Sequence, residues 1–185
     1  MQRRTLALAA AAGFAALAGA VALFALDTDM GSRTAPDWTE TAWPFPPDPF
    51  GQGKAFRCSP AGCGTEIRLY VRSKLGFCDC TTGVADDDDL DRMGDVYLVA
   101  AEATPLLSGR PVSVGPMRGR TRAYALLPPG AAAKTAISVA VNDRCDMIVT
   151  TAVLPRDDAS SFEGHVIAFL NSVSVLHWIE VTLGL

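Results

Sequence analysis

The feature that most constrains this chain is an uncharged apolar run at its start. Arg3 and Arg4 precede the run, which extends over 21 residues from Leu6 to Leu26. A helix of about 20 residues crosses the hydrocarbon core of a bilayer. Positive flanking residues stay on the cytoplasmic side. Residues 1–26 are therefore predicted to be a single-pass inner-membrane anchor, with everything after Leu26 in the periplasm.

A cleaved signal peptide is the alternative interpretation of the same residues. Ala18-Gly19-Ala20 and Ala20-Val21-Ala22 both match a small-x-small cleavage site. Cleavage after Ala20 would leave the apolar stub 21–26 on the mature protein, and this stub would need burial. The need to bury this stub favours an uncut anchor over a cleaved protein that is secreted or periplasmic. In both cases the rest of the chain is exported.

Charge excludes one class of partner for the exported part. The chain of 185 residues carries a formal net charge of −4, and without Arg3 and Arg4 the charge is −6. Nucleic-acid binding relies on Lys and Arg that neutralise phosphates. We therefore expect no nucleic-acid partner and no electrostatic attraction to anionic lipid. The remaining length suffices for one domain with its own core.

Residues 27–53 are predicted to be a linker and lead-in to the domain. Five prolines between Pro36 and Pro49 forbid a regular helix there. The same stretch carries four large aromatic residues, which form an aromatic and proline-rich surface for a partner in one interpretation: Trp38, Trp43, Phe45 and Phe50. In the other interpretation the rings fold back over the core, as their large apolar area favours.

A hairpin is predicted around the first two cysteines. Residues 66–72 alternate in polarity, which is typical of a half-buried strand. Cys58 and Cys63 flank residues 59–62, whose composition is typical of a turn. We expect Cys58 before the turn and Cys63 just after it.

A short helix and a buried strand are expected next. Residues 86–89 are four aspartates that suit the first turn of a helix, and Gly94 suits a left-handed position at its end. Residues 96–100 are apolar and are predicted to form a buried strand. Residues 105–116 are predicted to be loop or sheet edge.

The strongest local pattern is a second hairpin. Residues 137–141 alternate, 142–144 suit a turn, and 145–154 are the predicted return strand. Residues 118–127 form another predicted strand, with one polar face: Arg118, Arg120, Arg122 and Tyr124. A capping box formed by Ser160 and Glu163 starts a predicted helix to about Asn171. The tail beyond it fits a strand or a continued helix.

These elements predict an α+β fold over residues 54–185. Antiparallel hairpins with segregated helices argue against a doubly wound sheet. We expect a single domain with a five- or six-stranded sheet and the C-terminal helix packed on one face.

Five cysteines in an exported chain predict structural disulfides. Cys58 and Cys63 are one candidate pair, and Cys145 can take either Cys78 or Cys80. The alternative is thiol chemistry, because Cys78 and Cys80 would lie on the same face of a strand. Two thiolates there could bind a soft metal such as copper(I), or undergo redox exchange.

Two charged clusters have functional alternatives to simple solvation. Asp87, Asp89, Asp91 and Asp95 follow the first part of a calcium-loop frame, but Arg92 and Leu98 stand where glycine and glutamate are needed. Capping of a helix explains the aspartates without calcium. The three arginines at strand period could bind an anion, since guanidinium groups match phosphate and carboxylate. They are also typical of a solvated face.

Catalytic signatures are weak, and no cofactor is implied. His165 and His177 are the two histidines, and the sequence lacks a Gly-x-Ser-x-Gly elbow to pair with either. The sequence therefore favours a non-enzymatic, membrane-anchored accessory domain that binds a protein partner. Trp38, Trp43, Phe45, Phe50 and the arginines of 118–122 are the predicted contacts.

Overall fold

The computed structural model describes residues 37–76, 79–127, 132–155 and 159–185. The predicted anchor at 1–26 and the first part of the lead-in lie outside the described residues, as do Cys78 and the Pro128–Gly130 segment. The described residues belong to one compact unit, Ala35–Leu185.

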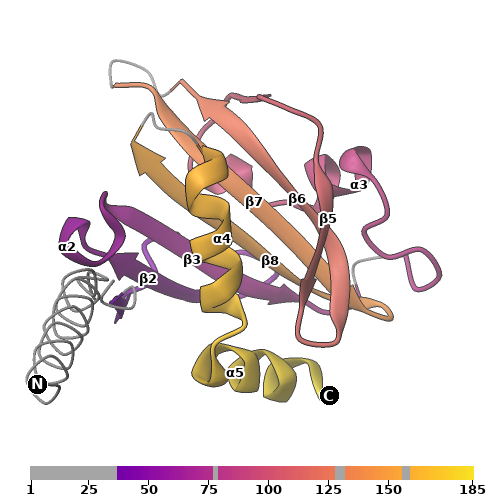
Figure 1. The fold of residues 1–185 in the computed structure, drawn as a ribbon. Helices are drawn as coiled ribbons and strands as arrows, with labels where there is room; N and C mark the ends of the chain where they lie inside the picture. Colours follow the sequence, from indigo (N-terminus) through magenta and orange to yellow (C-terminus); the bar gives the residue numbers. More distant parts are fainter. Residues whose placement is uncertain (1–36, 77–78, 128–131, 156–158) are drawn as a thin grey trace, which may run out of the picture. The chain divides into compact units, whose positions relative to one another are not determined.

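A single antiparallel sheet of eight strands organises this unit (Figure 1). The strand order is β1-β2-β3-β8-β7-β6-β4, and β5 also pairs with β6. The bounds are β1 Trp38–Thr41, β2 Lys54–Cys58, β3 Ile67–Lys74, β4 Ala103–Pro105, β5 Arg110–Val114, β6 Met117–Leu126, β7 Lys134–Asp143 and β8 Asp146–Pro155. The prediction of an α+β domain built from antiparallel hairpins is confirmed. The sheet is wider than expected because the lead-in supplies β1, residues 103–105 supply β4, and the segment predicted as loop or sheet edge at 105–116 supplies β5.

Helices cover both faces of the sheet. The bounds are α2 Pro60–Cys63, α3 Asp87–Met93, the 3-10 helix η1 Val96–Leu98, α4 Ala159–Leu170 and α5 Val173–Leu183. Helix α4 crosses the front of the sheet in Figure 1, and α5 follows it along the lower edge. Helix α3 contacts β6 and β7 on the opposite face.

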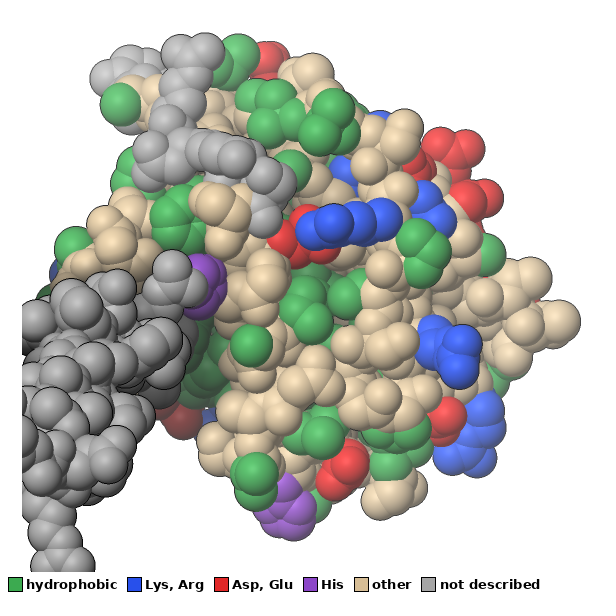
Figure 2. Space-filling model, viewed as in Figure 1, with side chains coloured by type: hydrophobic (Ala, Val, Ile, Leu, Met, Phe, Trp, Pro, Cys, Tyr) green, Lys and Arg blue, Asp and Glu red, His purple; other side chains and the backbone are tan. Residues whose placement is uncertain are grey.

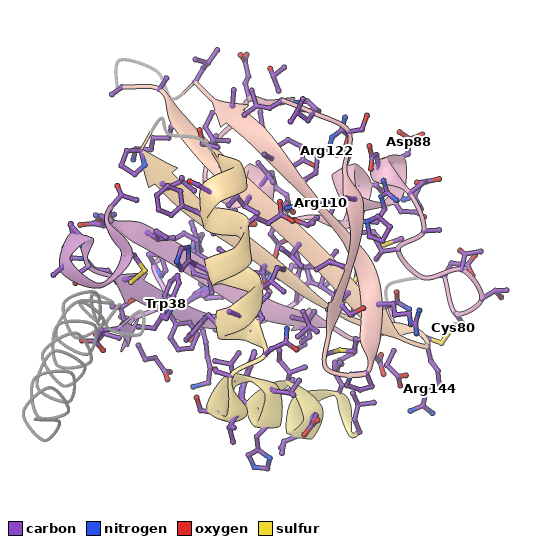
Figure 3. The ribbon with its side chains drawn as sticks, viewed as in Figure 1. Trp38, Cys80, Asp88, Arg110, Arg122 and Arg144 are labelled. Atoms are coloured by element: carbon purple, nitrogen blue, oxygen red, sulfur yellow. A yellow bond between two sulfur atoms is a disulfide. The ribbon has the colours of Figure 1, made fainter. Side chains whose placement is uncertain are left out.

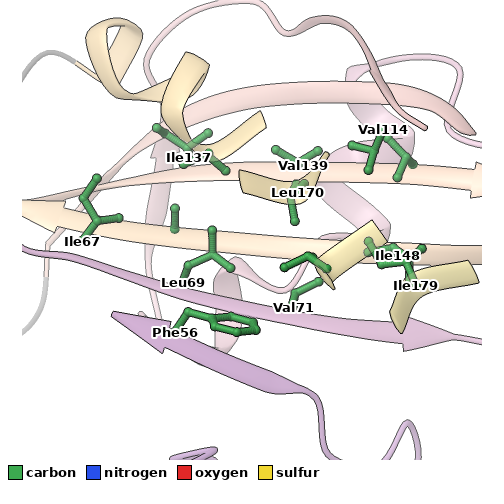
Figure 4. Close-up of a cluster of buried hydrophobic side chains, with 14 of the residues drawn as sticks. Phe56, Ile67, Leu69, Val71, Val114, Ile137, Val139, Ile148, Leu170 and Ile179 are labelled. Carbon is green, nitrogen blue, oxygen red and sulfur yellow. The ribbon is translucent and has the colours of Figure 1, made fainter. Parts of the chain in front are cut away.

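The main core lies between the sheet and the helices α4 and α5 (Figure 4). Alternate residues of each central strand point into it, such as Leu69 and Val71 of β3 and Val139 of β7. Leu170 of α4 and Ile179 of α5 close this core, and all five side chains are buried. The apolar side chains that alternate along the strands therefore pack against the apolar face of α4, as predicted.

The opposite face carries a smaller core under α3. Leu90 and Met93 of α3 are buried against Ala140, Met147 and Val149 of the two central strands. Asp86 caps α3, because its carboxylate accepts a hydrogen bond from the amide of Asp89 at 2.9 Å. The predicted short helix is thus present, with its aspartates at the N-terminus where they complement the helix dipole.

Several local predictions are wrong in detail. Residues 96–98 form a 3-10 helix and not a buried strand, and the side chain of Tyr97 is exposed. Gly94 has φ −64° and is not left-handed. A glycine is needed there because a Cβ would lie 2.7 Å from the carbonyl oxygen of Leu90 and 3.0 Å from Ser138 Oγ.

The predicted hairpin of β7 and β8 is confirmed, whereas the turn after Cys58 and the start of the last helix differ from expectation. The segment after Cys58 is the one-turn helix α2, and β7 turns into β8 at Arg144, whose φ is +52°. Helix α4 begins at Ala159, and Glu163 pairs with Arg110 of β5 at 2.8 Å, whereas the side chain of Ser160, the other member of the predicted capping box, lies outside what the structure describes. The tail, which the sequence left open, is helix α5.

Candidate functional site

Strand β6, which carries Arg118, Arg120 and Arg122, is covered by the acidic helix α3. Asp87 accepts hydrogen bonds from Arg120 Nε and Nη2 at 2.8 and 2.6 Å and from the amide of Gly109 at 2.9 Å. Asp91 accepts from Arg122 Nη1 at 2.8 Å and from the hydroxyl of Tyr124. In Figure 3, Arg122 lies beside α3. The amide of Gly109 and the guanidinium of Arg120 hold the pKa of Asp87 below its ordinary value.

In these contacts the aspartates of α3 and the arginines of β6 neutralise one another. Arg120 and Arg122 are half-buried and neutralised within the chain, whereas Arg118 is exposed and has no ion pair among the described residues. Asp87 and Asp91 face arginines, and Asp95 points to β3. Within the described ranges, no three Asp, Glu, His or Cys side chains gather as a metal site would require.

A second charged cluster, which the sequence did not reveal, lies buried on β3. Arg72 donates to both oxygens of Asp95, from Nε at 2.5 Å and from Nη2 at 2.9 Å. It also donates from Nη1 to Asp48 at 2.5 Å and from Nη2 to the hydroxyl of Tyr97 at 2.7 Å. Lys74 Nζ lies 2.8 Å from Asp95 Oδ1. Burial alone would lower the pKa of Arg72, but the carboxylates of Asp95 and Asp48 raise it above its ordinary value.

Most aromatic rings of the lead-in pack on the domain. Trp38 stacks on Phe169 of α4 with ring centroids 4.4 Å apart, and Figure 3 places it at the α4 side of the sheet. The ring of Phe50 lies under the cations of Arg72 and Lys74, at 5.3 and 4.8 Å. Trp38 and Phe50 thus contact the domain, in agreement with the interpretation that the rings fold back.

Trp43 and Phe45 form a cluster with Tyr70 of β3. The centroids of Trp43 and Phe45 lie 6.1 and 4.8 Å from that of Tyr70, with near-perpendicular rings. Such edge-to-face contacts stabilise aromatic clusters beyond the area that they bury. Pro44, which lies between Trp43 and Phe45 in the sequence, lines the surface hollows beside Tyr70. Burial raises the pKa of the Tyr70 hydroxyl.

The surface on both sides of Pro44 is hollowed, and we call it the Pro44 trough. On one side a groove of about 360 Å³ is lined by Thr41, Ala42, Pro44, Phe56, Arg57, Arg68 and Tyr70. On the other side a groove of about 220 Å³ is lined by Pro44, Phe45, Arg68, Tyr70, Leu98, Val99, Leu126, Lys134 and Val153. A third hollow of about 390 Å³ adjoins the second through Arg68, Lys134 and Val153, and includes Glu66, Ala132, Ala133, Leu154 and Pro155.

The trough is basic on an acidic domain. Three cations line it, namely Arg57, Arg68 and Lys134, against the single carboxylate of Glu66. Glu66 pairs with Arg57 at 2.6 Å and with Arg68 at 2.9 Å, and these two bonds lower its pKa. Lys134 is exposed and has no ion pair among the described residues. A positive charge therefore remains beside aromatic and aliphatic walls, an arrangement that suits an anionic ligand with apolar parts.

Two disulfides are formed. Cys58 and Cys63 are joined across α2, and Cys80 is joined to Cys145 at the tip of the β7–β8 hairpin, beside Arg144 in Figure 3. The alternative prediction of a thiol or copper site needs Cys80 as a free thiolate, and here Cys80 is bonded. Cys78 lies outside the described residues. His165 and His177 are exposed on α4 and α5.

Sequence patterns gave little sign of the trough. Arg68 and Lys134 each occupy an ordinary exposed position near the end of a strand. Strand β8 pairs with both β3 and β7, and this pairing brings the two cations to one end of the sheet. The partner residues predicted from the sequence contribute Phe45 to the trough lining. A comparison with models of known protein families and with curated proteins finds no match to this chain.

Proposed function

We propose that this protein is an exported binding domain, held at the inner membrane by residues 1–26, that engages an acidic segment of a protein partner in the Pro44 trough. Two disulfides support export, because structural disulfides persist in oxidising compartments. The apolar run from Leu6 to Leu26 supports the membrane tether.

The observation that carries the partner class is the charge of the trough. Arg57, Arg68 and Lys134 surround one carboxylate on a domain whose net charge is −6 without the leader. Complementary potentials steer a partner and set the register in which it docks. A basic patch that persists on an acidic domain therefore favours an acidic partner segment.

The shape of the trough favours an extended segment over a compact ligand. Its three hollows share Arg68 and follow one another across the ends of β3, β8 and β7. Apolar side chains of the partner would pack against Phe45, Leu98 and Val153, while its carboxylates meet Lys134 and Arg68. The folded lead-in forms one wall, so the site is assembled before the partner arrives and little ordering entropy is lost on binding.

The test is a charge reversal at Lys134 with a matched control at Arg118. Both side chains are exposed cations at strand positions, and neither has an ion pair among the described residues. The full chain is purified from its own membranes in mild detergent, and co-purifying proteins are quantified by mass spectrometry after cross-linking. We expect Lys134→Glu to lose a partner that Arg118→Glu keeps, with the cross-links on an acidic stretch of that partner.

The opposite result has a clear meaning. If Lys134→Glu and Arg118→Glu retain the same proteins in the same amounts, the trough is not the binding site. The far-ultraviolet circular dichroism of both variants must match the wild type, so that a loss of partner reports on the site and not on the fold.

A further inference from the structure

The chain around strand β4 is exposed over eight consecutive residues. Residues 101–108 are all exposed, and β4 forms one edge of the sheet, where it pairs with β6. Leu106 and Leu107 just after β4 are 49% and 73% exposed. Figure 2 shows hydrophobic side chains along the upper edge, where the chain runs towards β5 in Figure 1. Exposed apolar side chains that gather in one place mark a surface of interaction.

A hollow of about 210 Å³ extends this apolar surface towards η1. Ala101, Ala103 and Pro105 line it from the β4 side, and Tyr97 of η1 lines it from the other. This corner of the domain consists of strand, loop and short helices, and among the described residues no single helix is long and apolar enough to cross a membrane. The exposed stretch is therefore one apolar surface that includes an edge strand.

The stretch has the chemistry that the Pro44 trough is proposed to bind. Residues 101–107 read Ala-Glu-Ala-Thr-Pro-Leu-Leu, with one carboxylate, five apolar side chains and neither lysine nor arginine. We call them the β4 segment. Glu102 is exposed and has no ion pair among the described residues. The β4 segment is thus an extended, apolar segment with an unpaired negative charge.

The β4 segment and the trough adjoin at one corner of the domain. Ala103 of β4 lies opposite Leu126 of β6, and Leu126 lies opposite Lys134 of β7. Leu126 and Lys134 line the trough, together with Leu98 and Val99, which precede the β4 segment. In a two-fold interface each copy gives and receives the same contact, so both surfaces must lie in one patch. The fold meets this condition.

We propose that the Pro44 trough binds the β4 segment of a second copy of this chain, and that two such contacts form a two-fold dimer. This inference rests on the proposed function, because it names the partner of the trough. Glu102 of one copy meets Lys134 of the other, and neither charge has an ion pair within its own chain among the described residues. Leu106 and Leu107 pack against the apolar wall of the trough. The opposite charges set the register of the contact.

The first measurement uses a carbodiimide, which joins a carboxylate to an amine that touches it. Isotope-labelled and unlabelled full-length chains are mixed in mild detergent, coupled and digested for mass spectrometry. The chain has three lysines, and since Lys54 pairs with Glu40 and Lys74 is buried, Lys134 is the accessible one. We expect a peptide pair that joins Glu102 of a labelled chain to Lys134 of an unlabelled chain, which only contact between two copies produces.

The second measurement exchanges the two charges. Lys134→Glu and Glu102→Lys each place like charges together, so each should abolish the dimer that light scattering detects for the wild type. The combined variant should restore both the dimer and the mixed-isotope link. Arg118→Glu and Asp88→Lys are the matched controls, because both side chains are exposed and without an ion pair among the described residues, and they should keep the dimer. Circular dichroism checks that each variant is folded.

The dimer and the trough can fail separately. A monomeric wild type, a mixed-isotope link from Glu102 to a different amine, or a combined variant that stays monomeric overturns the dimer. If Lys134→Glu nevertheless loses another protein from the native membrane, the second copy is the wrong partner and the acidic-partner proposal stands. If Lys134→Glu changes neither the mass of the assembly nor the co-purifying proteins, both proposals fail.

Discussion

At the scale of single residues, the defining feature is the buried charge of Arg72. Its guanidinium and the ammonium of Lys74 face Asp95 and Asp48, and each charged atom of Arg72 has a partner. Burying a charge is costly unless it is paired and hydrogen-bonded. The network therefore ties the lead-in, through Asp48, and the η1 segment, through Asp95 and Tyr97, to strand β3.

Asp95→Asn should destabilise the domain strongly. The substitution keeps the shape of the side chain but removes the one carboxylate that pairs with both buried cations, and Asp48 then remains as the ion-pair partner of Arg72. Breaking a buried pair by removing one partner costs about 3–5 kcal/mol. Urea unfolding of the wild type and the variant measures the change, with Asp88→Asn on the exposed side of α3 as the control, expected within about 0.5 kcal/mol. Equal stability of the two variants would show that the network contributes little.

Asp48 predicts a defined pH dependence. The hydrogen bond from Arg72 lowers the pKa of Asp48 below its ordinary value of 3.8, burial opposes this, and the amide of Phe50 lowers it further. A folded-state pKa below the unfolded value contributes stability above the unfolded pKa, which is lost as the pH falls through the folded one. Asp48→Asn should thus be less stable than wild type at neutral pH, and the gap should close below pH 3.8. A gap in urea midpoints that stays constant with pH contradicts this assignment.

At the scale of elements, tertiary contacts hold both helix α3 and the loop that precedes it against the sheet. Asp87 and Asp91 join α3 to β6, while the Cys80–Cys145 disulfide joins the preceding loop to the β7–β8 hairpin. Val84 also donates its amide to Asn142 Oδ1 of β7 at 3.1 Å. A short helix has little stability of its own, so these tertiary contacts fix its position over the sheet.

The two disulfides should differ in their contribution to stability. Cys58 and Cys63 are five residues apart in sequence, whereas Cys80 and Cys145 are 65 apart. In the chain-entropy model the short loop is worth about 2 kcal/mol and the long loop about 4 kcal/mol. The Cys80→Ala/Cys145→Ala variant should therefore lose more free energy of unfolding than Cys58→Ala/Cys63→Ala. Denaturant unfolding of both variants decides this, and the reverse order would contradict the entropic account.

At the scale of the whole molecule, the lead-in is part of the fold. Trp38–Thr41 forms the edge strand β1, Asp48 neutralises Arg72, and the Trp43–Phe45 segment forms a wall of the trough. The predicted domain boundary at residue 54 falls inside this assembly.

Truncation tests the role of the lead-in. A protein that starts at Ala35 should unfold in one cooperative transition, since Ala35–Leu185 is one compact unit. A protein that starts at Lys54 loses β1, the Trp38–Phe169 stack and the Asp48–Arg72 pair, and should melt at least several degrees lower. Calorimetry of the two proteins gives the comparison. Equal melting temperatures would mean that residues 35–53 are a dispensable tether.

Local patterns were sufficient wherever neighbouring residues decide the structure. Strands β3, β6, β7 and β8 follow from alternation, and α3 follows from its capping aspartates and apolar positions. The prediction of a strand at 96–100 was wrong because a short apolar stretch fits a strand or a buried turn equally well. The α5 segment stayed open for the same reason, since its apolar residues fit both periods.

The sequence by itself determined an antiparallel α+β domain and predicted export, because polarity period, apolar length and cysteine content can be read from the sequence without the fold. The tertiary structure alone decided which charges meet. In the sequence, Arg120 and Arg122 resemble a free anion site, but in the fold the aspartates of α3 pair with them. Arg68 and Lys134 lie at one site because β8 pairs with both β3 and β7. Charge pairing acts between residues far apart in sequence, so the strand order had to be known before the basic trough could be recognised.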